Sequence, residues 1–136
     1  MLKFLAVLIL AFSLAACAGT MTTQPTAVAA AQNAAQQSLY AVGVALQATP
    51  AIVTALYNAA KINKDTYNSI VQDYNTTLAA YQLAVSALQA ATTAGEDPNL
   101  AVGYVNALAT FMTDKTNIDN LLTASGQKPI GAGVTQ

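Results

Sequence analysis

The sequence predicts an all-α protein, an antiparallel up-down-up bundle of three helices whose first helix is kinked or broken at Pro50. Alanine, the residue with the highest helix propensity, is abundant along the chain. Apolar residues recur every three or four positions, and no segment shows the alternation that is typical of a strand. The connections around 62–63 and 95–97 are very short, so neighbouring helices are expected to run antiparallel.

The first helical region is expected from about residue 28 to residue 61. A proline inside a helix removes a backbone hydrogen bond and clashes with the preceding turn, so we expect a kink or a restart at Pro50, with Thr49 as the N-cap. Residues 38–60 are uncharged and long enough to enter a membrane. Their polar side chains and the proline nevertheless make them a poor membrane span. The apolar side of this region consists of Leu39, Val42, Leu46, Ile52, Val53, Leu56 and Tyr57.

The central helix has the clearest boundaries, because Asn63 is a suitable N-cap and Gly95 is a suitable stop. Tyr67, Tyr74 and Tyr81 lie seven residues apart on one flank and form a candidate interaction stripe. Packing inside the bundle, with the hydroxyls at its rim, is the simpler interpretation of these rings. An aromatic ladder for a ligand or a partner is the alternative. The whole predicted seam consists of Tyr67, Val71, Tyr74, Leu78, Tyr81, Val85 and Leu88.

The last helix is predicted to begin with Asp97 as its cap and Pro98 as its first residue, and to end at 125–126. Lys115 interrupts its apolar face, but a lysine stem can lie along apolar surface. Lys115 and Asp119 are four residues apart and are expected to pair weakly. The apolar face consists of Ala101, Tyr104, Leu108, Phe111, Ile118 and Leu122.

The N-terminus has the three parts of a secretory signal. Lys3 gives a positive start, residues 4–14 form an 11-residue apolar run, and two small residues precede Cys17. The run is shorter than the roughly 20 residues that span a bilayer. The segment Leu14-Ala15-Ala16-Cys17 resembles the lipobox of bacterial lipoproteins.

This resemblance implies that the thiol of Cys17 carries a diacylglyceryl group and that the preceding residues are removed. Two acyl chains hold a protein firmly on a membrane. Ala18 is not aspartate, which by analogy with lipoprotein sorting favours the outer membrane, facing the periplasm. The expected organisation is a signal peptide at 1–16, a lipidated cysteine and flexible tether at 17–27, a helical bundle at 28–126 and a flexible tail at 127–136.

The composition includes few of the side chains that catalyse reactions or bind metals. Charged residues make up 8% of the chain, against about 25% in typical soluble domains, and none lies between Lys3 and Lys61. The sequence has no histidine, and its single thiol is the one expected to be lipidated. We therefore predict no catalytic residues, no metal site, no cofactor and no small-molecule substrate. The absence of a basic patch argues against nucleic-acid binding.

These observations leave three classes of function, and an enzyme is the least favoured of them because the side chains that catalysis needs are absent. The first is a lipid-anchored interaction or structural module of the bacterial envelope, whose partners are the membrane, through its lipid, and another envelope protein or a second copy. In its general features the whole chain resembles the small alanine-rich helical lipoproteins of phages and prophages. The alternative is a self-assembling coiled-coil oligomer or a membrane-active helical protein, including a spanin-like role in envelope disruption.

Overall fold

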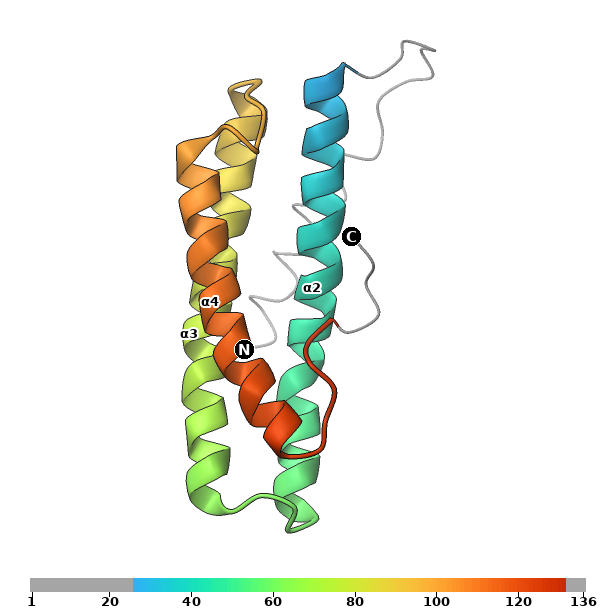
Figure 1. The fold of residues 1–136 in the computed structure, drawn as a ribbon, viewed down its shortest axis with the longest axis vertical. Coiled ribbons are helices and arrows are strands. Elements are labelled where there is room, and N and C mark those ends of the chain that lie inside the picture. Colours follow the sequence, from blue (N-terminus) through green and yellow to red (C-terminus); the bar gives the residue numbers. More distant parts are fainter. Residues whose placement is uncertain (1–25, 132–136) are drawn as a thin grey trace, which may run out of the picture.

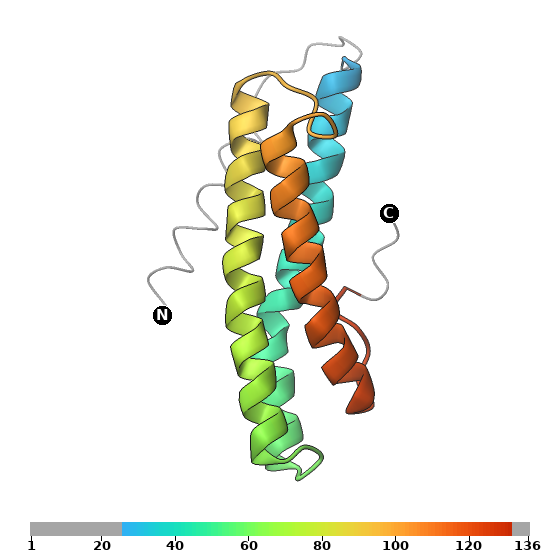
Figure 2. The ribbon, with the colours of Figure 1, turned by 60° about the vertical axis from the view of Figure 1, so that its left-hand side comes forward.

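The computed structural model describes residues 26–131, and within that range it consists of three helices and their connections (Figure 1). Helix α2 spans Ala27–Asn58, α3 spans Lys64–Thr93 and α4 spans Val102–Ala124. Successive helices run antiparallel, as the ribbon shows from two sides (Figures 1 and 2). The predicted all-α, up-down-up bundle is confirmed.

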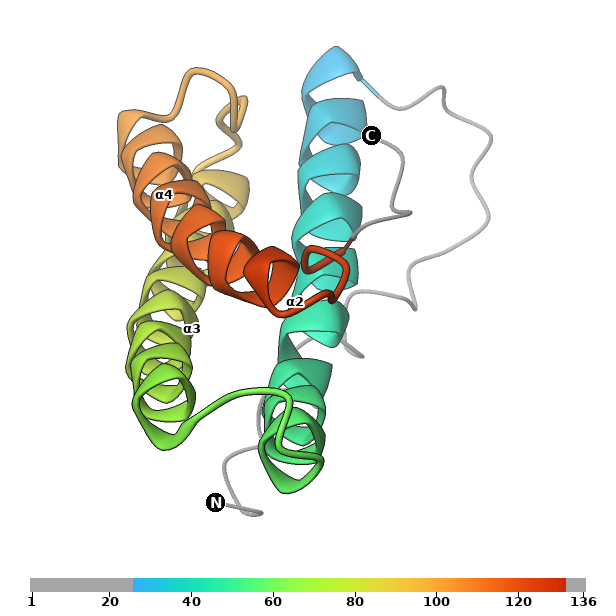
Figure 3. The ribbon, with the colours of Figure 1, turned by 60° about the horizontal axis from the view of Figure 1, so that its bottom comes forward.

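Helix α3 is the centre of the bundle. It packs along both α2 and α4, whereas the described parts of α2 and α4 make no close backbone approach to each other. Figure 3 shows α4 diverging from α3 toward its C-terminal end. Side chains from all three helices nevertheless share one apolar core. The bundle is therefore two helical hairpins that have α3 in common.

Helix α2 runs through Pro50 without interruption. The predicted restart with Thr49 as N-cap is wrong, and the N-cap is Thr26, whose side chain accepts a hydrogen bond from the Ala29 amide. Pro50 itself is exposed, while Leu46 and Val53 on either side of it are almost fully buried. Packing on both sides of the proline holds the helix in place against the local cost of the missing amide. A kink at this residue stays a prediction.

The α2–α3 connection agrees with the sequence at its α3 end, whereas α2 ends at Asn58, three residues before the predicted residue 61. Ala60 adopts a positive φ of 55°, and the Lys61 amide donates to the Leu56 carbonyl at 2.9 Å, which closes the last turn of α2. Asn63 caps α3 as predicted, because its Oδ1 accepts from the Thr66 amide at 2.8 Å.

The α3–α4 connection differs from the prediction. Gly95 ends α3 as expected, with a φ of 70°. Asp97, however, does not cap α4: its carboxylate accepts hydrogen bonds from the backbone and side-chain amides of Asn99. This Asx interaction, together with the buried Pro98, holds a separate turn. Helix α4 begins four residues later than predicted, after Ala101 and without a side-chain cap.

The buried face of α3 is rotated away from the predicted seam. Ile70, Thr77 and Ala84 lie seven residues apart and are completely buried, although none of them belongs to that seam. Val71, which does belong to it, is 38% exposed. The seam is correct at Tyr81, Val85 and Leu88, which are buried. Two of the three central residues, Thr77 and Ala84, have small side chains, which do not stand out in a search for large apolar residues.

The first part of the expected flexible tail packs on the bundle. Ile130 is 6% exposed, and its backbone amide donates to Asp119 Oδ1 at 2.6 Å. Lys115 Nζ contacts Asp119 Oδ2 at 2.5 Å, so the predicted pair is present. The same carboxylate therefore joins α4 to the segment that follows it. The expected signal peptide, Cys17 and nearly all of the tether lie outside the described residues, as do residues 132–136.

Candidate functional site

Tyr81 lies at the junction of the three helices. It is 4% exposed, and its ring meets Phe111 of α4 edge to face, with centroids 5.5 Å apart and an interplanar angle of 61°. On its other side the phenol end lies against Gly43 of α2. Burial, and secondarily the nearby Tyr40, raises the pKa of Tyr81 above its usual value, so the phenol stays protonated. Tyr81 is a packing residue in the interior.

Gly43 makes this junction possible. A β-carbon at this position would overlap the Tyr81 hydroxyl and lie 2.6 Å from Tyr81 Cζ. Gly43 is buried and lies in the middle of α2, where a glycine is otherwise unfavourable. The absence of a side chain at Gly43 therefore leaves the space that the end of the Tyr81 ring occupies.

The other two tyrosines of the candidate interaction stripe are partly buried. Tyr67 packs on Tyr57 of α2, with ring centroids 4.9 Å apart. Burial raises the pKa of Tyr74 as well. The three rings thus lie at different depths between the helices, and only Tyr67 and Tyr74 keep partial contact with the surface. The packing interpretation accounts for the observed contacts of Tyr67 and Tyr81.

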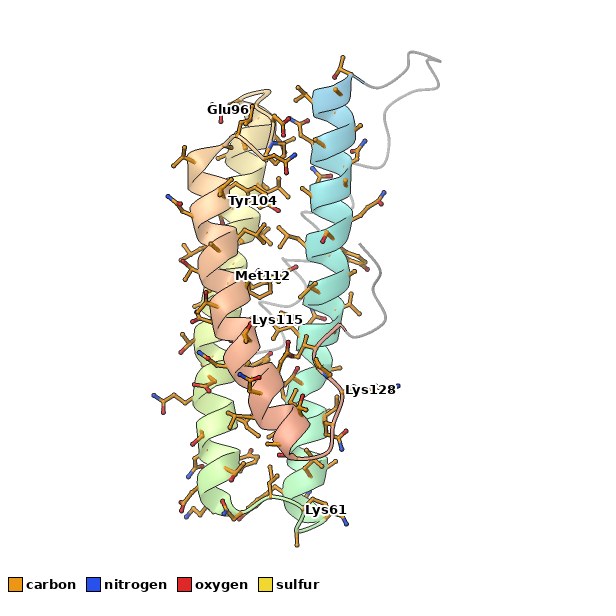
Figure 4. The ribbon with its side chains drawn as sticks, in the orientation of Figure 1. Lys61, Glu96, Tyr104, Met112, Lys115 and Lys128 are labelled. Atoms are coloured by element: carbon orange, nitrogen blue, oxygen red, sulfur yellow. The ribbon has the colours of Figure 1, made fainter. Side chains whose placement is uncertain are left out.

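An apolar stripe that the sequence analysis did not identify lies on α4. Val102, Val105 and Met112 are 71%, 42% and 43% exposed, and Ala109 between them is exposed too. Their spacing of three, four and three residues places them on one side of the helix. Figure 4 shows Met112 on the side of α4 that is turned toward α2. We call these four residues the α4 stripe. Its periodicity was readable in the sequence, but it was overshadowed by the stronger apolar face that is buried.

Helix α2 presents a second uncharged surface. Val44, Ala48, Ala51, Ile52 and Ala55 are all exposed, and they lie on the side opposite its buried residues. We call these five residues the outer face of α2. No charged residue occurs anywhere in the helix, and its most apolar stretch has a mean hydropathy of 1.6, with only 33% buried. By length and composition alone, α2 is the one described helix that could cross a membrane, a property that core helices share.

A shallow, open hollow of about 450 Å³ lies between α3 and α4. Asp73 is its only charged lining residue, and the remainder of its wall is mostly amide and hydroxyl groups. Residues 26–131 contain no cluster of three or more histidine, cysteine, aspartate or glutamate side chains that could bind a metal. The hollow offers hydrogen bonds but no nucleophile paired with a base. Its lining residues are Ser69, Gln72, Asp73, Asn117, Asn120 and Leu121.

The surface of the described bundle includes several large apolar side chains that are exposed. Its most distinctive features are the α4 stripe and the outer face of α2, which lie on different helices. Comparisons of the chain with protein-family models, with curated proteins and with solved structures gave no match.

Proposed function

We propose that this chain is a lipid-anchored, non-enzymatic protein of the bacterial envelope, and that its helical bundle serves as an interaction or structural module. The observation that carries the proposal is the sequence Leu14-Ala15-Ala16-Cys17 at the end of a short apolar run. With Ala18 after the cysteine, the outer membrane facing the periplasm is the proposed location. A phage or prophage origin belongs to the same proposal.

The α4 stripe supports the interaction part of the proposal. Val102, Val105 and Met112 are large apolar side chains that the bundle itself leaves exposed. Apolar residues at this spacing are the pattern by which one helix packs on another. A helical segment of another envelope protein is the partner that this pattern fits best.

Anchoring is tested by mass spectrometry of the protein purified from membranes. We expect a mature N-terminus at Cys17 that carries acyl chains, and we expect Cys17→Ser to leave the precursor unlipidated. Recovery of wild-type chains with residues 1–16 still attached and an unmodified thiol would contradict the proposal.

Partner binding is tested by placing a photo-crosslinking amino acid at Val105 in cells. Gln82 on α3 is exposed and does not belong to the stripe, so it provides the matched control position. We expect a discrete crosslinked species from position 105 and none from position 82. Equal crosslinking from both positions would show that the stripe is not a specific contact surface.

The same 3-4 spacing also favours a second candidate, self-association through the α4 stripe. Sedimentation velocity of the unlipidated Cys17→Ser chain distinguishes the two. A dimer or larger assembly that Val105→Lys dissociates would favour the oligomer. A monomer at all concentrations would favour a different partner.

A further inference from the structure

We propose that the outer face of α2 lies on the bilayer to which the chain is anchored, so that α2 is an interfacial helix parallel to the membrane. This inference rests on the proposed lipidation of Cys17 and goes beyond it, since an anchor alone does not orient the domain. It assigns α2 a lipid-contacting face and leaves α3 and α4 on the aqueous side.

The first argument is the distribution of charge. Every charged residue within the described range lies outside α2, on α3, on α4, on the connecting segments or, for Lys128, on the segment that follows α4. Figure 4 shows Lys61 and Glu96 near opposite ends of the bundle, Lys115 on α4, and Lys128 beside α2 on the segment that follows α4. A surface that carries no ionised group costs little to bring against acyl chains, whereas each buried charge would be expensive. The outer face of α2 is therefore the side of the bundle that is easiest to bury in lipid.

The second argument is that only one side of α2 is available. The opposite side receives Tyr81 at Gly43, and Gln32 Nε2 donates a hydrogen bond to the Glu96 carbonyl at 2.9 Å. A helix that crossed the bilayer would have to give up these contacts with α3 and the α3–α4 connection. A helix that lies in the interface keeps them and buries only Val44, Ile52 and their alanine neighbours.

The third argument is the position of the anchor. Nine residues separate Cys17 from the first residue of α2, and a fully extended chain of that length reaches about 30 Å. With 32 residues, α2 is about 48 Å long, so the reach of the tether is shorter than the helix. The tether therefore holds the N-terminal end of α2 close to the membrane, whatever the orientation of the remaining domain.

Anchoring also changes the affinity that is required. A tethered face meets the bilayer at a high effective concentration, so a modest apolar contact is enough to orient it. The two branched side chains and three alanines of the outer face would bind a membrane weakly from solution. In an anchored protein, the outer face of α2 only has to contact the bilayer more favourably than the charged sides of α3 and α4 do. This is the reason for choosing the lipid surface over a second copy of the chain as the occupant.

The experiment measures the depth of a fluorophore attached to the mature, full-length protein in vesicles of phosphatidylethanolamine and phosphatidylglycerol. The thioether at Cys17 does not react with thiol reagents, so a single new cysteine can be labelled. Ala48→Cys places the label on the outer face of α2, and Gln82→Cys places it on the exposed side of α3. Neither side chain is buried, so both variants should fold.

We expect quenching by a water-soluble paramagnetic ion to be lost at position 48 and retained at position 82. Quenching by nitroxide-labelled lipids should show the reverse order. Equal aqueous quenching at both positions, in protein that floats with the vesicles, would overturn the inference. Protection at position 48 that is equally strong without vesicles would show that a second copy covers the face and would also overturn it.

The mass spectrum of the same preparation keeps the two proposals apart. Acylated protein with an aqueous label at position 48 contradicts the orientation and leaves the anchor intact. Unmodified Cys17 contradicts the anchor. In that case, a label at position 48 that lipid still protects would support the membrane-binding face independently, and an aqueous label would overturn it.

Discussion

Replacing Gly43 by alanine tests how closely α2 and α3 approach each other. In an exposed helix interior this substitution stabilises a protein by about 0.5–1 kcal/mol, because alanine loses less conformational entropy on folding. At Gly43 the new methyl group would meet the Tyr81 hydroxyl and would lie 2.6 Å from Cζ. Overpacking of this kind costs about 1–3 kcal/mol. The overpacking term is the larger, so we expect a net destabilisation of about 1–2 kcal/mol.

Gly103 provides the matched control, since it lies in α4 and a β-carbon there meets nothing within 4 Å. Gly103→Ala should therefore leave stability unchanged or raise it by up to about 1 kcal/mol. Thermal unfolding of the unlipidated chain, followed by circular dichroism, measures both variants. For a domain of this size each kcal/mol corresponds to about 4–8 °C in Tm.

A double-mutant cycle identifies the atoms responsible. Tyr81→Phe removes the hydroxyl but keeps Cζ, so it should rescue Gly43→Ala only in part, and the two effects should be non-additive. If Gly43→Ala melts at or above the wild-type temperature, the phenol end does not pack against the α2 backbone, and the reasoning fails.

Three further comparisons test the core. Ile70→Ala should lower the free energy of unfolding by about 2–5 kcal/mol, because the side chain is fully buried, whereas Val71→Ala should change it by about 0.5 kcal/mol or less. If denaturant unfolding showed the larger loss for Val71→Ala, the seam predicted from the sequence would be the correct buried face. Thr77→Val should stabilise the protein by about 1 kcal/mol, since the buried Thr77 hydroxyl lacks a hydrogen-bond partner. The control Thr76→Val changes an exposed residue and should have little effect, so equal shifts for the two variants would contradict this account. Burial raises the pKa of Tyr81 above 10.0, so the unfolded chain releases the phenol proton at a lower pH than the folded chain does. The contribution of this shift to the free energy of unfolding is complete below about pH 10 and should decline as pH rises toward the raised pKa. Tyr81→Phe should therefore make the alkaline loss of stability shallower, and an unchanged slope would contradict this account.

The sequence predicted those features of the fold that depend on local signals. Asn63 and Gly95 mark the ends of α3 because capping and positive φ depend on one or two residues. The pairing of Lys115 with Asp119 follows from their spacing on a helix. The number, order and direction of the helices follow from these ends and from the short connections.

Features that depend on tertiary packing were predicted less well. Thr77 and Ala84 have no strong apolar character, so a periodicity search passes over them in favour of tyrosines and valines, although they occupy the centre of the α3 face. Pro50 argues locally for a restart, but buried neighbours on both sides keep α2 continuous. The Asp97 carboxylate can accept hydrogen bonds from the first turn of a helix or from a separate turn. In the structure it accepts them from Asn99, so it stabilises the separate turn.

The residues of the candidate site also differ in whether a local sequence signal or the tertiary packing determines their role. Cys17 can be identified from sequence because its signal is a contiguous motif. The different depths of Tyr67, Tyr74 and Tyr81 could not be read from their regular spacing, since depth depends on which helix lies opposite each ring. The exposed outer face of α2 likewise becomes visible only once its buried side is known.

The central position of α3 has a consequence for how the polypeptide acquires its shape. Every close backbone approach between the described helices joins neighbours along the chain, either α2 with α3 or α3 with α4. Topologies of such low contact order assemble within microseconds to milliseconds. The α2–α3 half can therefore form as soon as its own residues are available, and it offers a ready template onto which α4 then docks.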